Sequence, residues 1–152
     1  MKEIKNVFIE ATEKTPQVDF NYLTGELILA GKSIPENTTE FYTPLFSWIE
    51  QYIQAARRTT NLRLNLEYFN TASSIWLAKI VKCLSKIDAP ESILLIHLYF
   101  SIEEFDTMDV EDVKDAISHI VDIINTSIMS IGVKIYGTDS NGAIIKESMV
   151  LI

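Results

Sequence analysis

Alternating apolar and polar residues mark one stretch in the middle of the chain. Residues 62–68 read Leu, Arg, Leu, Asn, Leu, Glu and Tyr, and this period of two predicts a strand with one buried face. Beyond the polar run 70–74, apolar residues recur at helical spacing, at Trp76, Ile80, Cys83, Leu84 and Ile87. The chain is therefore predicted to pass from strand to helix at 70–74, with Trp76, Ile80, Cys83 and Leu84 facing the sheet.

The same patterns predict the elements that precede this strand. Residues 17–20 and 26–30 are apolar runs on either side of a turn-forming segment, which is typical of a hairpin. A helix is predicted to follow, because apolar residues share one stripe at Phe41, Leu45, Trp48, Ile49, Tyr52 and Ile53. Pro44 lies inside this stretch, so either the helix restarts at Pro44 or it kinks there.

The second half of the chain predicts a further strand, a helix and a closing strand pair. Residues 92–100 are almost continuously apolar, which favours a strand that is central in the sheet or buried on both faces. Residues 110–128 carry an apolar stripe at helical spacing, and Gly132 is expected to end that helix. Residues 133–136 and 143–152 then form the closing pair. Together the elements predict one domain over 1–152, a two-layer α/β sandwich with a mixed sheet and helices mainly on one face.

Charge and composition narrow the classes of partner. The net charge of −8 argues against nucleic acid or an anionic membrane as the main partner. Residues 88–152 contain 12 acidic and 3 basic residues, so the excess lies in the second half, as a solvated helix face or as a surface that selects a basic partner. No stretch is apolar for long enough to span a bilayer, and Cys83 is the one cysteine. We expect a cytoplasmic protein without disulfides.

The run 70–74 is the first candidate for chemistry. Asn70 or Thr71 can serve as the helix N-cap, because their side chains accept hydrogen bonds from first-turn N–H groups. Alternatively, a hydroxyl at this junction is a place where a phosphate is favoured, since a helix N-terminus carries partial positive charge and free donors. The spacing alone leaves both interpretations open.

Other sites are weakly indicated. The sequence has no phosphate-binding loop, nucleophile elbow or paired metal-ligand histidines, and His97 inside an apolar strand is typical of a structural histidine. The acidic connection 103–109 lacks the glycine and alternating ligands of a calcium loop. A small ligand- or metal-binding α/β domain, possibly catalytic, that uses 103–109 is the alternative to a regulatory protein; otherwise we expect no cofactor and no metal.

Four segments resemble one family. They read Ile-Glu-Ala-Thr-Glu-Lys-Thr-Pro-Gln-Val-Asp-Phe at 9–20, Thr-Gly at 24–25, Pro-Glu-Asn-Thr at 35–38 followed by Phe41 and Trp48, and Tyr-Phe-Asn-Thr-Ala-Ser-Ser at 68–74. In this order they resemble the SiaC family of bacterial regulatory phosphoproteins, over roughly residues 7–100. The chain departs from the family pattern at Ala72, where serine is usual, and at Ile34, where tyrosine is usual. The helix and hairpin from about 101 resemble the family less and look like a divergent end.

The resemblance implies a STAS-like fold and a switch rather than an enzyme. It implies that Thr71 is phosphorylated by a Ser/Thr protein kinase and dephosphorylated by a PPM-type phosphatase. The unphosphorylated protein is then expected to bind and activate a diguanylate cyclase or another effector, and so to control cyclic-di-GMP and biofilm formation. The residues expected around the phosphosite and at the partner contact are Tyr68, Asn70, Ser73, Ser74, Glu36 and Asn37.

Overall fold

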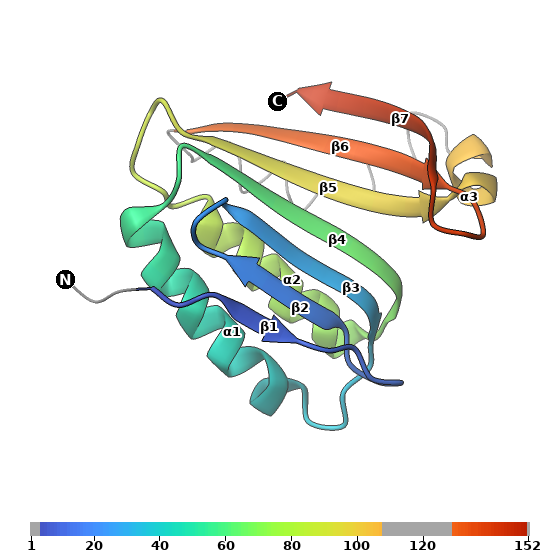
Figure 1. Cartoon of the computed structure of the whole chain (residues 1–152), viewed down its shortest axis with the longest axis horizontal. Helices are drawn as coiled ribbons and strands as arrows, with labels where there is room; N and C mark the ends of the chain where they lie inside the picture. The colour runs from blue at the N-terminus through green and yellow to red at the C-terminus, as the bar shows by residue number, and fades with distance from the viewer. Residues whose placement is uncertain (1–3, 108–128, 152) are drawn as a thin grey trace.

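The strands of the described residues lie in one mixed sheet, in the order in which they follow one another along the chain (Figure 1). The computed structural model describes residues 4–107 and 129–151. The strands are β1 (Val7–Ile9), β2 (Gln17–Asn21), β3 (Glu26–Ser33), β4 (Thr59–Phe69), β5 (Ile93–Ser101), β6 (Ser130–Thr138) and β7 (Ile144–Leu151). The helices are α1 (Thr38–Tyr52), the 3-10 turn η1 (Ile53–Ala55), α2 (Thr71–Leu84) and α3 (Ile102–Thr107).

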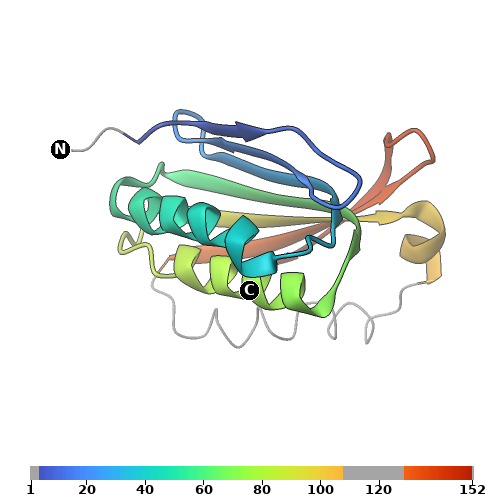
Figure 2. The same ribbon diagram turned by 90° about the horizontal axis from the view of Figure 1, so that it is seen from below.

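Strands β3 to β6 are parallel, and the sheet ends in antiparallel pairs, β1 and β2 with β3 on one side and β7 on the other. Helix α1 connects β3 to β4, and α2 connects β4 to β5. Parallel crossovers of one handedness place both helices on the same face, as Figure 2 shows. The predicted two-layer α/β sandwich with a mixed sheet is confirmed, while its likeness to STAS domains stays a prediction.

The core lies between this face of the sheet and helices α1 and α2. Its fully buried residues alternate along the strands and recur at helical spacing in α1 and α2: Val18, Phe20, Leu27, Leu29, Leu62, Leu94 and Ile96 in the sheet, and Tyr42, Ile49, Tyr52, Ile80 and Leu84 in the helices. Ile80, Cys83 and Leu84 are buried in this core, as predicted. Trp76 is half-buried against the same core, and its indole stacks on Tyr42 of α1, with ring centroids 6.0 Å apart.

Helix α1 is uninterrupted from Thr38 to Tyr52, with Asn37 as its N-cap. Pro44 lies within it, so the predicted restart at that residue was wrong. A proline at this position cannot donate to the carbonyl four residues earlier. The Thr43 hydroxyl, one residue before, donates to the Thr39 carbonyl at 2.7 Å. Burial of the stripe on the sheet holds the helix together across the proline.

Three differences from prediction lie outside the central motif. Strand β1 adds an edge strand next to the predicted hairpin, and Gly132 lies inside β6 rather than at a helix end. The acidic connection after β5 begins as helix α3 rather than as a loop. The predicted helix over 110–128 lies outside the described residues. None of the helices within 4–107 and 129–151 is long and apolar enough to cross a membrane.

The face of the sheet opposite the helices carries a hydrogen-bonded polar network. Arg63 on β4 donates from Nε to Glu26 on β3 at 2.8 Å and from Nη1 to the Tyr99 hydroxyl on β5 at 2.8 Å. The Tyr99 ring stacks on Tyr136 of β6, with centroids 4.6 Å apart. One guanidinium therefore links three neighbouring strands on this face.

His97 is held from both ring nitrogens within this network. Its Nε2 lies 2.8 Å from Asn61 Oδ1, and its Nδ1 lies 2.7 Å from the Tyr136 hydroxyl. Since the amide oxygen only accepts, Nε2 carries the proton and Nδ1 accepts from the tyrosine. The side chain is 3% exposed, so the histidine has the structural role that its place in an apolar strand predicted.

The unfolding free energy should fall as the pH is lowered through the titration of His97. Burial, together with the nearby Arg63 charge, lowers the pKa of His97 to about 4. Between about pH 6.5 and this value, the imidazole binds a proton in the unfolded protein but not in the folded one. The free energy of unfolding therefore decreases as the pH is lowered across this window. Carboxylates titrate there as well, so the measurement compares wild type with His97→Gln in urea melts at pH 7, 5.5 and 4.5. A smaller loss in the variant is expected; equal losses would contradict the assignment.

Candidate functional site

The candidate site is the junction at which β4 ends and α2 begins. Asn70 has extended backbone angles, and its Oδ1 accepts from Ser73 N–H at 2.9 Å. Its carbonyl accepts from Ser74 N–H at 3.0 Å, which starts the helix. Asn70 is therefore the N-cap, and the alternative in which Thr71 is the cap is wrong.

Thr71 is the first residue of α2, and its side chain is exposed. Within the described part of the chain, its hydroxyl makes no hydrogen bond. The N–H groups of a first helical turn have no acceptor inside the helix, and here the Asn70 side chain takes only that of Ser73. Thr71 thus combines an accessible hydroxyl with free backbone donors and the positive end of a helix dipole, the surroundings that a phosphate favours.

Ser73 stabilises the junction through buried hydrogen bonds. Its hydroxyl is fully buried, donates to the Ser33 carbonyl at 2.9 Å, and accepts from the Ser33 hydroxyl at 2.8 Å. The Ser33 hydroxyl also bonds Tyr42 Oη of α1, and the Ser33 carbonyl accepts from Asn70 N–H at 3.1 Å. Burial raises the pKa of Tyr42, while the hydrogen bonds with the two serines oppose that shift. Because Ser73 ties α2 to β3 and α1, it is placed to support the junction rather than to contact a partner.

Exposed apolar side chains precede and follow Thr71 along the chain. Tyr68 is 60% exposed, Phe69 is 49% exposed, and Ile75, one turn after Thr71 in α2, is 53% exposed. We call Tyr68, Phe69, Thr71 and Ile75 the junction surface. Apolar side chains gathered on a surface are a common mark of a protein contact. Sequence reasoning missed Phe69 and Ile75; an isoleucine off the apolar stripe of α2 was the available signal.

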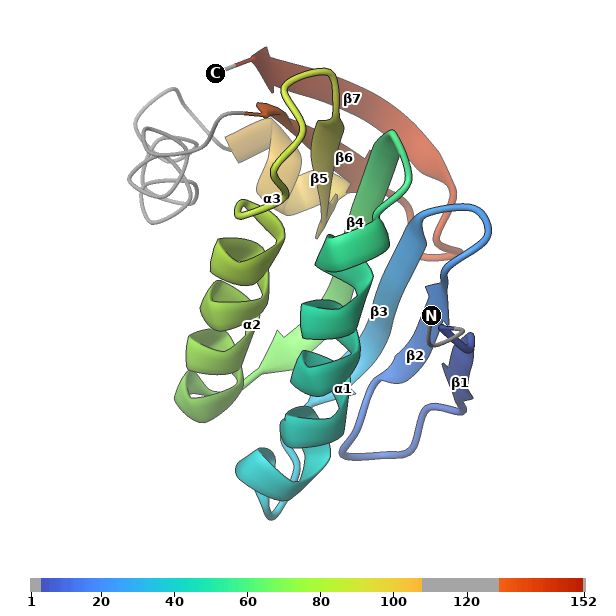
Figure 3. The same cartoon turned by 90° about the vertical axis from the view of Figure 1, so that its left-hand side faces the viewer.

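The other predicted residues lie nearby with different roles. The Ser74 hydroxyl donates to the Thr71 carbonyl at 2.7 Å, which leaves it less available than Thr71. Asn37 caps α1 by accepting from Glu40 N–H at 3.0 Å. Glu36 pairs with Lys14 at 2.9 Å, and the hydrogen bond from Lys14 lowers the pKa of this exposed carboxyl. Figure 3 shows α1 and α2 starting at the same end of the sheet. Glu36 and Asn37, which precede α1, therefore lie at the same end of the sheet as Thr71. In the described ranges, no hydrogen bond or ion pair joins Glu36 or Asn37 to residues 68–74.

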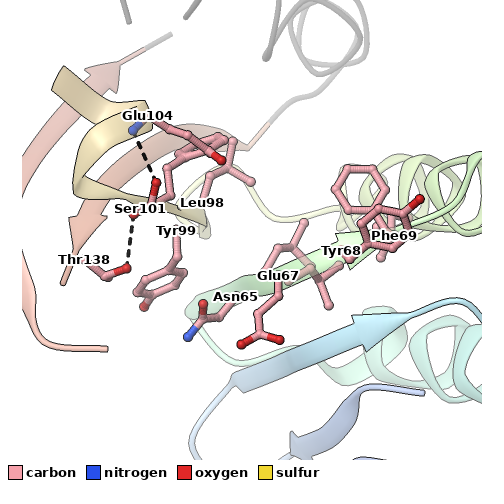
Figure 4. A pocket seen from close by; sticks show the side chains of 13 residues that line it. Asn65, Glu67, Tyr68, Phe69, Leu98, Tyr99, Ser101, Glu104 and Thr138 are labelled. Carbon is pink, nitrogen blue, oxygen red and sulfur yellow. Dashed lines mark hydrogen bonds between the residues drawn. The ribbon is translucent and has the colours of Figure 1, made fainter. Parts of the chain in front are cut away.

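A cleft of about 690 Å³ opens beside the junction surface (Figure 4). It lies between the last residues of β4 and those of β5, with one wall from α3. The lining residues are Leu64, Asn65, Leu66, Glu67, Tyr68, Phe69, Leu77, Leu98, Tyr99, Phe100, Ser101, Glu104 and Thr138. Tyr68 and Phe69 belong to both the cleft and the junction surface, so the two features are continuous.

The alternative site at 103–109 receives little support from the geometry. Glu103, Glu104 and Asp106 are exposed on α3, and Asp106 pairs with Lys146 of β7 at 2.8 Å. Nowhere in residues 4–107 or 129–151 do three or more His, Cys, Asp or Glu side chains gather as metal ligands would. Asp109 lies outside the described residues.

Comparison with solved structures supports the fold. The chain is similar to apo-SiaC from Pseudomonas aeruginosa, with a TM-score of 0.63 at 23% identity, covering 84% of this chain and 98% of that one. A second SiaC structure from that organism has a TM-score of 0.59 at 25% identity, covering 67% of this chain and 89% of that one. The crystal structure of diguanylate cyclase SiaD in complex with its activator SiaC, also from P. aeruginosa, contains a chain with a TM-score of 0.65 at 20% identity, covering 86% of this chain and 99% of that one.

Sequence comparison identifies the family. An uncharacterised protein of P. aeruginosa strain UCBPP-PA14 is 31% identical over 70 residues, which are 46% of this chain. The matched region spans 56% of the length of that relative. The model of the SiaC family, described as regulatory phosphoproteins, matches residues 9–129, which include the hairpin, both N-caps and the strand–helix junction. The chain therefore belongs to the SiaC family of regulatory phosphoproteins.

Proposed function

We propose that this protein is a non-enzymatic partner-switching protein whose switch is phosphorylation of Thr71. A Ser/Thr protein kinase adds the phosphate, and a PPM-type phosphatase removes it. The unphosphorylated form binds and activates a diguanylate cyclase in the cytoplasm, and phosphorylation ends that binding. The observation that carries the proposal is the exposed Thr71 hydroxyl at a helix start, among exposed apolar side chains.

The position of Thr71 suits reversible modification. Its hydroxyl is exposed, whereas that of Ser73 is buried and that of Ser74 is bonded to the backbone. A phosphate on Thr71 adds about −1.5 to −2 charge next to first-turn N–H groups, which favour an anion. Because the Asn70 cap and the Ser73 hydrogen bonds do not involve the Thr71 side chain, the fold should survive the modification.

The junction surface explains how the phosphate ends binding. A partner that packs on Tyr68, Phe69 and Ile75 must remove water from the Thr71 side chain as well. A neutral hydroxyl allows this at small cost, but an unpaired buried charge costs several kcal/mol. Attraction between the phosphate and an exposed basic residue of the partner contributes only about 0–1 kcal/mol. Desolvation therefore dominates, and the phosphorylated form is released.

The membership of the family and one structural neighbour support the choice of partner. The family is described as regulatory phosphoproteins. The neighbouring complex pairs SiaC, named there as an activator, with the diguanylate cyclase SiaD. We extend this pairing to the present chain and its host's own cyclase as part of the proposal.

Thr71→Glu should abolish cyclase binding while the protein stays folded. The carboxylate lies at the start of α2, where an acidic residue stabilises a helix by about 0.3–1 kcal/mol. Thr71→Ala should keep binding, lose phosphorylation, and change the unfolding free energy by about 0.5 kcal/mol or less, because Thr71 is not the cap. Asn70→Ala is the control for the cap and should cost about 0.5–2 kcal/mol.

The measurements are calorimetric binding to the purified cyclase, urea melts, and mass spectrometry of protein from the native host with and without its phosphatase. Ser74→Ala is the matched control for phosphorylation and should still be modified. Phosphate found only away from Thr71 would contradict the proposal, as would a Thr71→Glu variant that binds the cyclase as tightly as wild type.

A further inference from the structure

Strands β4 and β5 separate before either of them ends. They are paired from Thr59 with Ile93 up to Leu64 with Leu98. Beyond this point β4 continues to Phe69 beside β3, and β5 continues to Ser101 beside β6. In this stretch of the described chain, the facing edges of β4 and β5 are not paired with each other, and the cleft lies between them (Figure 4).

A β-bulge lies within the separated stretch of β4. Gly31 of β3 pairs with Leu66 of β4, and the next residue, Lys32, pairs with Tyr68. Glu67 is therefore an extra residue in β4 without an opposite partner on β3. A bulge of this kind bends its strand and increases the local twist. The bulge therefore bends the part of β4 that is paired with β3 and not with β5.

Helix α3 forms the far wall of the cleft because a glycine lets it approach the sheet. A Cβ on Gly137 of β6 would lie 2.9 Å from the Phe105 ring and 3.0 Å from Ile102 Cδ1. With no side chain at Gly137, α3 packs directly on β6. This packing places Glu104 at the cleft, which Glu67 of β4 also lines.

The side chains that line the cleft indicate what kind of ligand it can bind. Leucines at 64, 66, 77 and 98 provide an apolar lining, and Glu67 and Glu104 add exposed carboxylates. Among the residues that the structure describes, no lysine or arginine lines the cleft, so this lining would repel an anionic ligand such as a nucleotide. Free strand edges supply backbone donors and acceptors in the pattern that an extended peptide uses.

We infer that the β4–β5 cleft binds an extended segment of the partner protein that carries an apolar side chain next to a lysine or arginine. The segment pairs along the free edge of β4, the apolar side chain contacts the leucines, and the basic residue faces Glu67 and Glu104. This inference rests on the proposed function and names the contact by which the cyclase is held. The phosphate acts on the adjoining junction surface through Tyr68 and Phe69, which border both.

Charge reversal tests the inference. Glu104→Lys and Glu67→Lys should each weaken binding of the purified cyclase about tenfold or more, because a basic segment then meets like charge. Glu103→Lys is the matched control: it makes the same change on the same exposed helix, but Glu103 does not line the cleft, so binding should be kept. Circular dichroism and urea melts verify that each variant is folded.

Hydrogen exchange of backbone amides gives a second measurement. A purely electrostatic effect of the charge reversals would not change it. Amides in 65–69 should exchange more slowly when the cyclase is bound, because a paired segment protects them. Protection confined to other elements would overturn the inference, as would equal binding by Glu103→Lys and Glu104→Lys. If Thr71→Glu abolishes binding and the cleft variants do not, the inference about the cleft is wrong, but the proposed phosphorylation switch is still supported. If the wild-type protein does not bind the cyclase, the proposed function and the inference both fall.

Discussion

Replacement of Gly25 by alanine is expected to destabilise the protein by about 2–6 kcal/mol, for two separate reasons. Gly25 has a φ of +75°, a conformation that costs other residues about 1–3 kcal/mol. A Cβ at this position would also lie 2.4 Å from the Thr59 carbonyl oxygen at the start of β4. Because that oxygen belongs to the backbone, relief requires moving a strand rather than rotating a side chain.

Gly142→Ala is the matched control for this prediction. Gly142 has a φ of +82°, but a Cβ there would meet no atom within 4 Å. Its replacement should therefore cost only the conformational part, about 1–3 kcal/mol. Urea melts of both variants separate the two contributions, and equal losses would show that the contact with Thr59 is easily relieved.

Ile80→Ala is expected to cost about 2–5 kcal/mol. Ile80 is fully buried where α2 packs on the sheet, so the substitution removes apolar contacts and leaves a cavity. Ile75→Ala makes the identical change on the same helix at a side chain that is 53% exposed, and it should cost about 0.5 kcal/mol or less. Denaturant melts of the two variants measure both losses of unfolding free energy. A loss below about 1 kcal/mol for Ile80→Ala would contradict the packing of α2 on the sheet.

The fold could be predicted where one physical pattern determined the answer. Alternation in β4 and the continuous apolar run of β5 identified strands, because burial on one or both faces dictates those patterns. The predicted helix restart at Pro44 was wrong because a proline weakens a helix only locally, whereas α1 is stabilised along its whole length by packing on the sheet. The stacking of Trp76 on Tyr42 was not predicted, because an apolar stripe tells which face of a helix is buried but not which side chains of another helix it meets.

The candidate site was located from sequence but not resolved in detail. Asparagine and threonine both cap helices, so only the backbone angles of Asn70 decide between Asn70 and Thr71. The buried bonds of Ser73 to Ser33 join residues 40 positions apart, which no local pattern reveals. Phosphorylation of Thr71, the kinase and the phosphatase stay predictions, as do the single-domain organisation and the divergent end from about 101.

The bulge at Glu67 has a consequence for changes in chain length. Side chains alternate between the two faces of a strand, so one extra residue fixes which of its successors face inward. Deleting Glu67 would leave Tyr68 opposite Lys32 and Phe69 opposite Ser33, because it removes the one residue of this stretch that has no partner on β3. What would be lost is the local bend and extra twist of β4. The bulge therefore acts as a spacer, and its deletion would keep the 68–74 motif in register while changing the course of the strand that leads to it.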